Sequence, residues 1–423
     1  MNEALIAITI FVLVYAAIIS EKVDRAAVAL LGGMAVIILI RSYDQEAAFA
    51  AIDLNVIFLL TGMMVIANIM GETGVFQWMG VKAIQLGKGN PTRIMQILVI
   101  VTAFTSALLD NVTVVVLLAP VTLVAASSLG VSPIPFLIAE VLASNIGGAA
   151  TLIGDPPNIL IGSAAGIDFL TFLLNMGPYI LIVLAFFVLG LPLLFRKQLR
   201  IAKADMTEPA AVDASTLITD PTLLRKSLIV LGAVLVGFMV HGFLGLESAT
   251  IALAGAAVLM LWTGQEAHRV FHHVEWATLM FFVGLFVLVE GLVHVGVIDT
   301  IANELFEATG GNVPITTIAL LWGSAILSGV VDNIPYTATI IPVILKLGED
   351  GMNIWPLWWA LAMGADLGGN LTIIGASANV VVASFAERSG HKISFATFFK
   401  YGAVTTFFSM IIATLFLMVF YLR

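Results

Sequence analysis

The sequence predicts an all-α polytopic membrane protein, with about ten transmembrane helices arranged as two inverted repeats that each contain a re-entrant hairpin and a broken helix. Composition is the first reason. Hydrophobic residues make up 60% of the 423 residues, charged residues only 11%, and the mean hydropathy is +1.09. Ordinary soluble proteins carry about 25% charged residues, so that class is excluded. The absence of cysteine excludes disulfides, thiolate metal sites and thiol redox chemistry.

A duplicated polar stretch is the second reason. Residues 144–162 read SNIGGAATLIGDPPNILIG, and residues 365–383 read ADLGGNLTIIGASANVVVA. The two stretches align with Gly147 on Gly368, Gly148 on Gly369, Thr151 on Thr372, Gly154 on Gly375 and Asn158 on Asn379. Glycines, hydroxyls and amides inside long apolar segments indicate helices broken within the membrane, where protein or water must satisfy the open backbone. Paired interruptions of this kind point to the binding site of a transporter.

The elements can be placed in order from the apolar runs. The first repeat covers residues 1–195, a polar cytoplasmic linker covers 196–222, and the second repeat covers 223–423. The first repeat is expected to hold spans near 4–20, 25–40 and 53–70, an amphipathic piece at 75–91, a re-entrant hairpin at 92–128, a broken helix at 134–165 and a last span at 169–195. The second repeat is expected to hold spans near 224–241, 247–263 and 275–291, an amphipathic piece at 297–309, a hairpin at 313–347, a broken helix at 355–387 and a last span at 396–422.

Charge distribution predicts the orientation. If both hairpins enter and leave on one side, each repeat crosses the membrane an odd number of times, so the repeats are inverted. With the N-terminus outside, only Arg41, Lys346 and Arg423 of the 18 Lys and Arg residues are external, as the positive-inside rule requires. We therefore expect a multi-pass protein of the cell (inner) membrane.

The hairpin tips carry the third observation. Asp110-Asn111 and Asp332-Asn333 stand at matching positions in apolar surroundings. A charge at the bilayer centre costs about 3 kcal/mol even on the lenient scale, so these residues are candidates for substrate or ion binding. They could also cap the second half-helix of each hairpin, and both roles are compatible.

The helix breaks offer half-helix N-termini. We expect Asp155 to be an N-cap that accepts backbone N–H groups, with Pro156 at the first helical position and Ser377 in a similar capping place. Such N-termini favour an anion or a polar, oxygen-rich solute. The alternative is that they are caps and kinks with no solute.

The two halves differ chemically. Asp366 replaces Asn145, and Asn370 and Thr372 add neutral oxygens, a set that suits Na⁺ or a proton. Glu140 and Glu290 could relay protons or be hydrogen-bonded within the bundle. His268, His272 and His273 fit a solvated loop better than a metal site.

At these residues the chain resembles the ArsB/NhaD-type permeases of the ion transporter superfamily, a group related to P protein and, more distantly, to the divalent anion/sodium symporters. The resemblance lies in GGAATLIGDPPNILIG, GGNLTIIGASANVVVA, LLDNVTVVVLLAP and VVDNIPYTATIIP. It implies a homodimer with a scaffold domain and a mobile transport domain that moves like an elevator. The residues that it places at the site are Asp110, Asn111, Asn145, Thr151 and Asn158 on one side, and Asp332, Asn333, Asp366, Asn370, Thr372 and Asn379 on the other.

The expected function is secondary transport, with no enzymatic activity, no cofactor beyond a coupling proton or Na⁺, no resident metal and no nucleic-acid partner. The symporters carry Ser-Asn-Thr at their hairpin tips, whereas this chain carries Asp-Asn, and the added negative charge argues against a dicarboxylate. The first hypothesis is efflux of arsenite or antimonite in exchange for protons, and the second is Na⁺/H⁺ antiport. A passive channel fits the interrupted helices less well, and an intramembrane hydrolase would need an activated nucleophile that the sequence does not offer.

Overall fold

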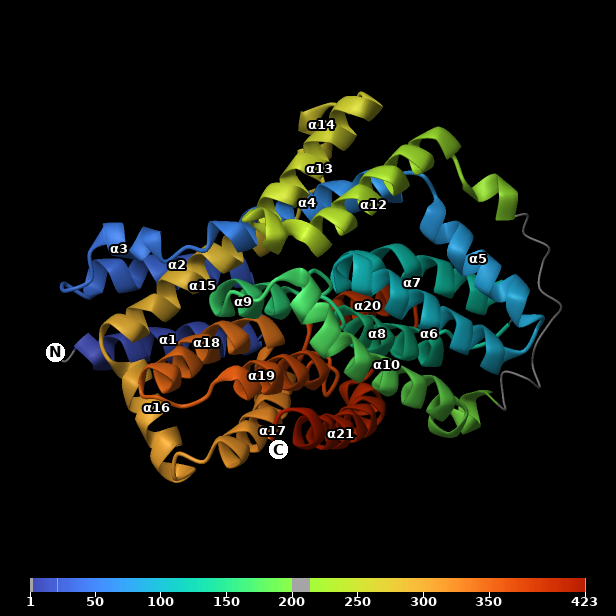
Figure 1. Ribbon diagram of the computed structural model, residues 1–423. Coiled ribbons are helices and arrows are strands. Elements are labelled where there is room, and N and C mark those ends of the chain that lie inside the picture. Colours follow the sequence, from blue (N-terminus) through green and yellow to red (C-terminus); the bar gives the residue numbers. More distant parts are fainter. Residues whose placement is uncertain (1–2, 21, 129, 200–213, 423) are drawn as a thin grey trace.

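The computed structural model describes residues 3–20, 22–128, 130–199 and 214–422. Most of the predicted linker, residues 200–213, lies outside the described part, as does Arg423. All regular elements in the described ranges are helices (Figure 1). An all-helical chain follows from the composition, because a backbone in hydrocarbon must satisfy its own hydrogen bonds.

The helices follow in the same order in both halves of the chain. The first half contains α1 (Glu3–Ser20), α2 (Arg25–Leu39), α3 (Gln45–Ala50), α4 (Leu54–Gly71), α5 (Val75–Gly87), α6 (Pro91–Leu108), α7 (Asn111–Ser128), α8 (Ile134–Gly148), α9 (Pro156–Ala165) and α10 (Phe169–Leu194). A short 3₁₀ turn, η1 (Ala214–Leu217), precedes the second half. The second half contains α12 (Pro221–Leu244), α13 (Ser248–Thr263), α14 (Ala267–His272), α15 (Trp276–His294), α16 (Val297–Ala308), α17 (Val313–Val331), α18 (Asn333–Glu349), α19 (Trp355–Gly368), α20 (Ser377–Arg388) and α21 (Phe395–Phe420).

Eight of the described stretches are long and apolar enough to cross a membrane: α1, α3 with α4, α6, α10, α12, α15, α17 and α21. Helices α2 and α13, predicted as spans, have only 15 and 16 residues. At 1.5 Å per residue they extend roughly 24 Å, less than the hydrocarbon thickness of about 30 Å. The number of complete crossings therefore stays a prediction.

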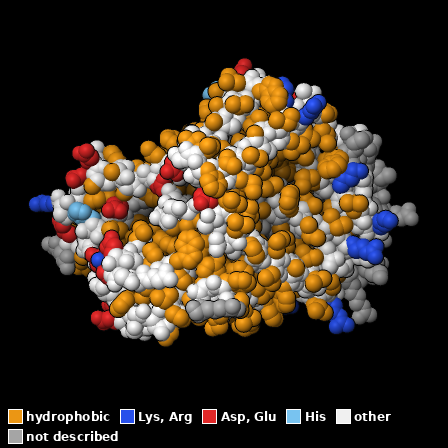
Figure 2. Space-filling view, viewed as in Figure 1, with side chains coloured by type: hydrophobic (Ala, Val, Ile, Leu, Met, Phe, Trp, Pro, Cys, Tyr) orange, Lys and Arg blue, Asp and Glu red, His pale blue; other side chains and the backbone are white. Residues whose placement is uncertain are grey.

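The outer surface is apolar. Large side chains such as Leu193, Phe243 and Leu261 are 78%, 85% and 85% exposed, and orange atoms dominate the middle of the face seen in Figure 2. Charged atoms in that view gather mainly toward the ends and the top of the molecule. A surface of this kind is suited to lipid rather than water. The chain is a multi-pass membrane protein.

Helices of the first half pack directly against helices of the second half. Helix α2 packs against α15, and α4 packs against α13, so each of these pairs joins different halves. Glycines permit the close crossings: a Cβ at Gly284 would lie 2.4 Å from the Ala29 backbone, and a Cβ at Gly62 would lie 2.6 Å from the Ala252 backbone. In Figure 1 the pair α4 and α13 lies at the top of the molecule, and the pair α2 and α15 lies at its left.

The broken helices lie inside the remaining bundle. Helix α8 packs on α6, and α19 packs on α17, with Gly147 against Ala103 and Gly368 against Ala325. The second arm of each hairpin also meets the second half of the other repeat's broken helix, since α7 contacts α20 and α18 contacts α9. This arrangement brings both hairpin tips and both helix breaks to one place.

Candidate functional site

Each hairpin tip is fastened to the helix break of its own half. The backbone N–H of Asn111 donates to the Gly154 carbonyl, and that of Asn333 donates to the Gly375 carbonyl, both at 3.1 Å. Ser106 and Ser328, one turn earlier, donate their hydroxyls to the Ser144 and Ala365 carbonyls at 2.7 and 2.6 Å. The matched motifs therefore build one local structure twice.

Two matching amides, Asn158 and Asn379, form the same hydrogen bonds at the breaks of both halves. Asn158 Nδ2 donates to the carbonyls of Gly148 (3.2 Å) and Thr151 (3.0 Å). Asn379 Nδ2 donates to the carbonyls of Gly369 and Thr372, both at 2.8 Å. These bonds satisfy carbonyls that the interrupted helices leave without partners. Both amides thus stabilise the breaks through their NH₂ groups and leave Oδ1 for other contacts.

The predicted site residues Thr151 and Thr372 are also part of these turns. Thr151 Oγ1 donates to the Ala107 carbonyl and Thr372 Oγ1 to the Gly329 carbonyl, both at 2.6 Å. Both hydroxyl protons are used by backbone of the hairpin arms. In the described contacts these threonines position the tips.

Asp155 links the two halves. Its Oδ2 accepts from Asn111 Nδ2 at 2.7 Å, and its Oδ1 accepts from Asn333 Nδ2 at 3.2 Å. The predicted cap was wrong in its bonding: Asp155 occupies the N-cap position of α9, but its side chain accepts no backbone N–H. Each of the two amides instead occupies one oxygen of the carboxyl group. The N-cap of α20 is Ala376, and Ser377 is the first helical residue.

A second chain of amides crosses between the halves behind Asp155. Asn145 Nδ2 donates to Asn370 Oδ1 at 2.9 Å and to Asn379 Oδ1 at 3.0 Å. Asn145 Oδ1 in turn accepts from Asn111 Nδ2 at 3.2 Å. Asn145, Asn370 and Asn379 are fully buried. The sequence predicts these three amides at the binding site, whereas in the structure they are buried and do not line the pocket described below.

The acidic residues at the hairpin tips cap the second arms, as predicted. Asp110 Oδ1 accepts from the Thr113 N–H at 2.8 Å, and Asp332 Oδ1 accepts from the Ile334 N–H at 3.0 Å. Asp332 adopts φ 89°, a conformation that is uncommon for a residue with a side chain. The contacts of the tip hold it there.

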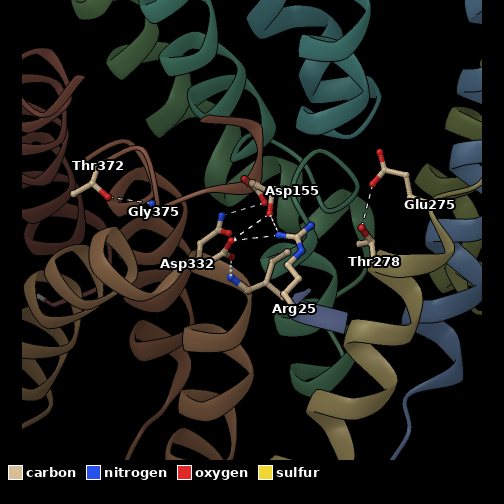
Figure 3. Close-up of polar contacts among 10 residues, drawn as sticks. Arg25, Asp155, Glu275, Thr278, Asp332, Thr372 and Gly375 are labelled. Carbon is tan, nitrogen blue, oxygen red and sulfur yellow. Dashed lines mark hydrogen bonds and ion pairs between the residues drawn. The ribbon is translucent and has the colours of Figure 1, made fainter. Parts of the chain in front are cut away.

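Arg25 is a site residue that sequence analysis missed. It begins α2, and its guanidinium forms an ion pair with Asp332 Oδ2 at 3.7 Å and a hydrogen bond to Ser377 Oγ. Figure 3 shows Arg25 reaching toward Asp332, with Asp155 nearby. Sequence analysis had grouped it with the cytoplasmic basic residues, and no motif marks it.

Figure 3 also shows Glu275, which occupies the N-cap position of α15 without a side-chain capping bond, directed at Thr278. The Thr278 hydroxyl donates to its Oε2 at 3.1 Å. Both residues line a pocket at the meeting point, and sequence analysis missed both. The pocket is lined by Arg25, Leu60, Met64, Asp110, Asn111, Val112, Asp155, Pro156, Glu275, Thr278, Asn333, Ile334 and Ser377. Three carboxylates therefore face one arginine, with no sulfur ligand except the Met64 thioether.

Several predicted residues stay outside this pocket. Asp366 is completely buried, and neither of its carboxyl oxygens has a hydrogen-bond partner among the described residues. The same holds for both carboxyl oxygens of Glu140, while Glu290 is only partly buried. The side chains of His268, His272 and His273 are exposed, as predicted, but they belong to helix α14 and its C-cap rather than to a loop. No cluster of possible metal ligands occurs in the parts of the chain that the structure covers.

Comparisons with known proteins agree with this architecture. The citrate transporter family, CitMHS, matches residues 15–364. The chain belongs to this family. An uncharacterised transporter of Mycobacterium tuberculosis is 44% identical over 421 residues, which cover 98% of each chain. Human P protein is 34% identical over 485 aligned residues, which cover 95% of this chain and 58% of P protein.

A solved structure supports the fold of this CitMHS member. The Alcanivorax borkumensis YdaH transporter, whose crystal structure reveals an unusual topology, matches with a TM-score of 0.62 over 99% of this chain and 98% of that one. The sequences are 15% identical, so this likeness concerns the fold alone. The predicted relation to P protein is confirmed, and the CitMHS protein is a membrane transporter.

Proposed function

We propose that this CitMHS member is a secondary active transporter that exports arsenite or antimonite in exchange for protons. The observation that carries the proposal is the acid- and amide-lined pocket at the junction of two hairpin tips and two helix breaks. Its oxygens come from both halves, so relative movement of the tips would change the site from both sides.

The chemistry of the pocket favours a neutral, hydroxylated solute. Arsenite at neutral pH is a trihydroxide, and its O–H groups can donate to Asp110, Asp155 and Glu275 while its oxygens accept from Asn111 and Asn333. A free tricarboxylate fits less well, because three carboxylates against one arginine would repel it. Citrate, which the family description names, is therefore one of the solutes added in the test below.

Na⁺/H⁺ antiport is the second candidate. Asn111 Oδ1, Asn158 Oδ1 and both Asp366 oxygens are buried acceptors without donors among the described residues. A hard cation or a proton would satisfy such oxygens.

We further propose an inner-membrane homodimer with its N-terminus outside, working by elevator-like movement and without enzymatic activity. The positive-inside distribution supports the orientation. Arg25, on the α2/α15 side, contacts the hairpin tip through side chains alone, and such a contact can be broken without disturbing a helix.

The test uses purified protein in sealed liposomes with an internal pH dye. Arsenite, antimonite, Na⁺, Li⁺, citrate and succinate are added separately to the parent, Asp110→Asn and Glu307→Gln. Glu307 is an exposed carboxylate on α16 and provides the matched control. We expect arsenite-driven proton movement in the parent and in Glu307→Gln, and its loss in Asp110→Asn.

A response to Na⁺ or Li⁺ alone would replace the first candidate with the second. A response to citrate alone would contradict both candidates. Equal proton movement in all three proteins would remove Asp110 from the mechanism.

A further inference from the structure

The two repeats differ at one buried contact. Asn145 of the first repeat contacts Asn379 of the second. The residues at the two matching positions are Asp366 in the second repeat and Asn158 in the first. Asn145 Nδ2 donates to Asn379 Oδ1 at 3.0 Å. Asp366 offers no amide N–H, so the equivalent bond cannot form in the same way.

Asn158 cannot supply the missing proton. Its Nδ2 donates to the carbonyls of Gly148 and Thr151, just as Asn379 Nδ2 donates to Gly369 and Thr372. Turning the Asn158 amide over would place Oδ1 against two carbonyl oxygens. The backbone therefore holds the amide with Oδ1 directed away from the turn, and this oxygen has no donor among the described residues.

Asp366 lies beside the Asn158 side chain, where α19 packs against α9. It is 0% exposed, and neither oxygen receives a hydrogen bond from the described residues. An ionised carboxylate would thus lie, without solvent, beside an amide whose Nδ2 already donates to two backbone carbonyls, and it would have no hydrogen-bond donor among the described residues. Such a contact is costly unless a proton or a cation lies between the two groups.

The surrounding charges do not supply a cation. Helices α10 and α17 contain no acidic or basic residue within their bounds, although Asp168 is the N-cap of α10 and Tyr179 lies on that helix. The charged groups on the other elements packed against α19 are Glu140 on α8, Asp155 at the start of α9, Asp332, Lys346 and Glu349 on the tip and body of α18, and Lys400 on α21. Arg25 pairs with Asp332, and Lys346 pairs with Glu349 and Asp350.

We propose that Asp366 is the binding site for the coupling proton: as a carboxylic acid it donates its O–H to Asn158 Oδ1. Na⁺ would need several more oxygens than this pair provides. When the acid ionises, its O–H bond breaks, the proton passes to water or a base in the pocket, and the remaining carboxylate gains no hydrogen bond from Asn158, whose Nδ2 stays on the Gly148 and Thr151 carbonyls. The hydrogen bond between Asp366 of α19 and Asn158 of α9 is then lost, so protonation of Asp366 is linked to the relative position of these two helices. This inference rests on the proposed proton-coupled transport.

Infrared difference spectroscopy of the purified protein tests the proposal without any solute. At neutral pH we expect C=O absorption from protonated carboxyl groups in the parent and the loss of one component of it in Asp366→Asn. Glu140, a second buried carboxyl without a partner among the described residues, should keep its own component in both proteins. The variant replaces O–H by an amide N–H that can still donate to Asn158, so it should fold and melt at or above the parent temperature. An unchanged carboxylic acid band in Asp366→Asn would overturn the proposal.

The opposite exchange provides the matched variant. Asn145→Asp removes the donor to Asn370 and Asn379, so the new acid should also be protonated and add a further component. A new ionised carboxylate at residue 145, in a folded protein, would contradict the argument that a buried carboxyl group without a donor is protonated. The liposome assay separates the two claims: an Asp366 carboxylic acid component without solute-driven proton movement would reject the transport proposal alone, and proton movement that survives in Asp366→Asn would reject the proton site alone.

Discussion

Arg25 is the single basic residue lining the pocket, and its side chain is 35% exposed while that of Asp332 is 12% exposed. We predict that Arg25→Gln lowers stability by only about 1 kcal/mol, since a partly solvated ion pair contributes little. The larger effect is on selectivity. Without the guanidinium, Asp110, Asp155 and Glu275 are left without a cation in the pocket lining, so Na⁺ and Li⁺ should bind more tightly. Thermal-shift titrations with both ions provide the measurement.

Arg25→Lys is the matched control, because it keeps the charge but loses the planar fork that reaches Asp332 and Ser377 together. Its cation affinity should stay near that of the parent. If the Gln and Lys variants bind Na⁺ alike, the charge of Arg25 has no part in selectivity.

The duplication explains which residues could be found from sequence. Asp110, Asn111 and Asn158 were recognised because each has an identical counterpart in the other half. Arg25 is the first residue of α2, whereas the matching helix α13 begins with Ser248. Arg25 and its partner Ser377 are separated by 352 residues. A contact of that kind depends on how the start of α2 is placed against the starts of α18 and α20, which local sequence does not encode.

Helix breaks were the easiest elements to predict. The broken helix expected at 134–165 is observed as α8, ending at Gly148, and α9, beginning at Pro156. Glycine and proline mark such ends through backbone geometry alone. The bonding of the cap could not be predicted in the same way, because the Asp155 carboxyl group accepts hydrogen bonds from Asn111 and Asn333, which belong to two other elements.

The crossing of α8 over α6 gives a prediction for stability. A Cβ at Gly147 would lie 2.0 Å from the Ala103 carbonyl oxygen, and one at Gly368 would lie 2.6 Å from the Ala325 carbonyl oxygen. We expect Gly147→Ala and Gly368→Ala each to destabilise the protein by about 3 kcal/mol, because backbone rather than a flexible side chain must move. Melting in detergent, followed by fluorescence, measures the loss.

Gly323→Ala on α17 is the control, since a Cβ there meets nothing within 4 Å. It should leave stability unchanged or raise it by about 0.5 kcal/mol through helix propensity. Equal melting temperatures for Gly147→Ala and Gly323→Ala would contradict the close crossing.

At the scale of the whole molecule, the helix pairs α2/α15 and α4/α13 join the two halves and form what we call the first body. The hairpin tips and helix breaks gather around the pocket and form the second body. Polar side chains bridge the two bodies. Arg25 contacts Asp332 and Ser377, and Tyr15 of α1 shares a hydrogen bond with Thr339 (2.6 Å) and donates to the Pro335 carbonyl (2.7 Å) on α18. The elevator-like movement that we propose would have to break these contacts.

A cross-link can test this movement cleanly, because the chain contains no cysteine. We predict that Tyr15→Cys with Thr339→Cys, joined by a cleavable bifunctional thiol reagent, stops transport in liposomes and that reduction restores it. The control joins Lys226→Cys to Trp262→Cys on α12 and α13, where Lys226 Nζ donates to the Trp262 carbonyl at 2.7 Å within one body. That cross-link should leave transport unchanged. Parent-level transport in the cross-linked 15–339 protein would mean that α1 and α18 keep their relative positions during the cycle, so that access must change through local opening of the hairpin tips instead.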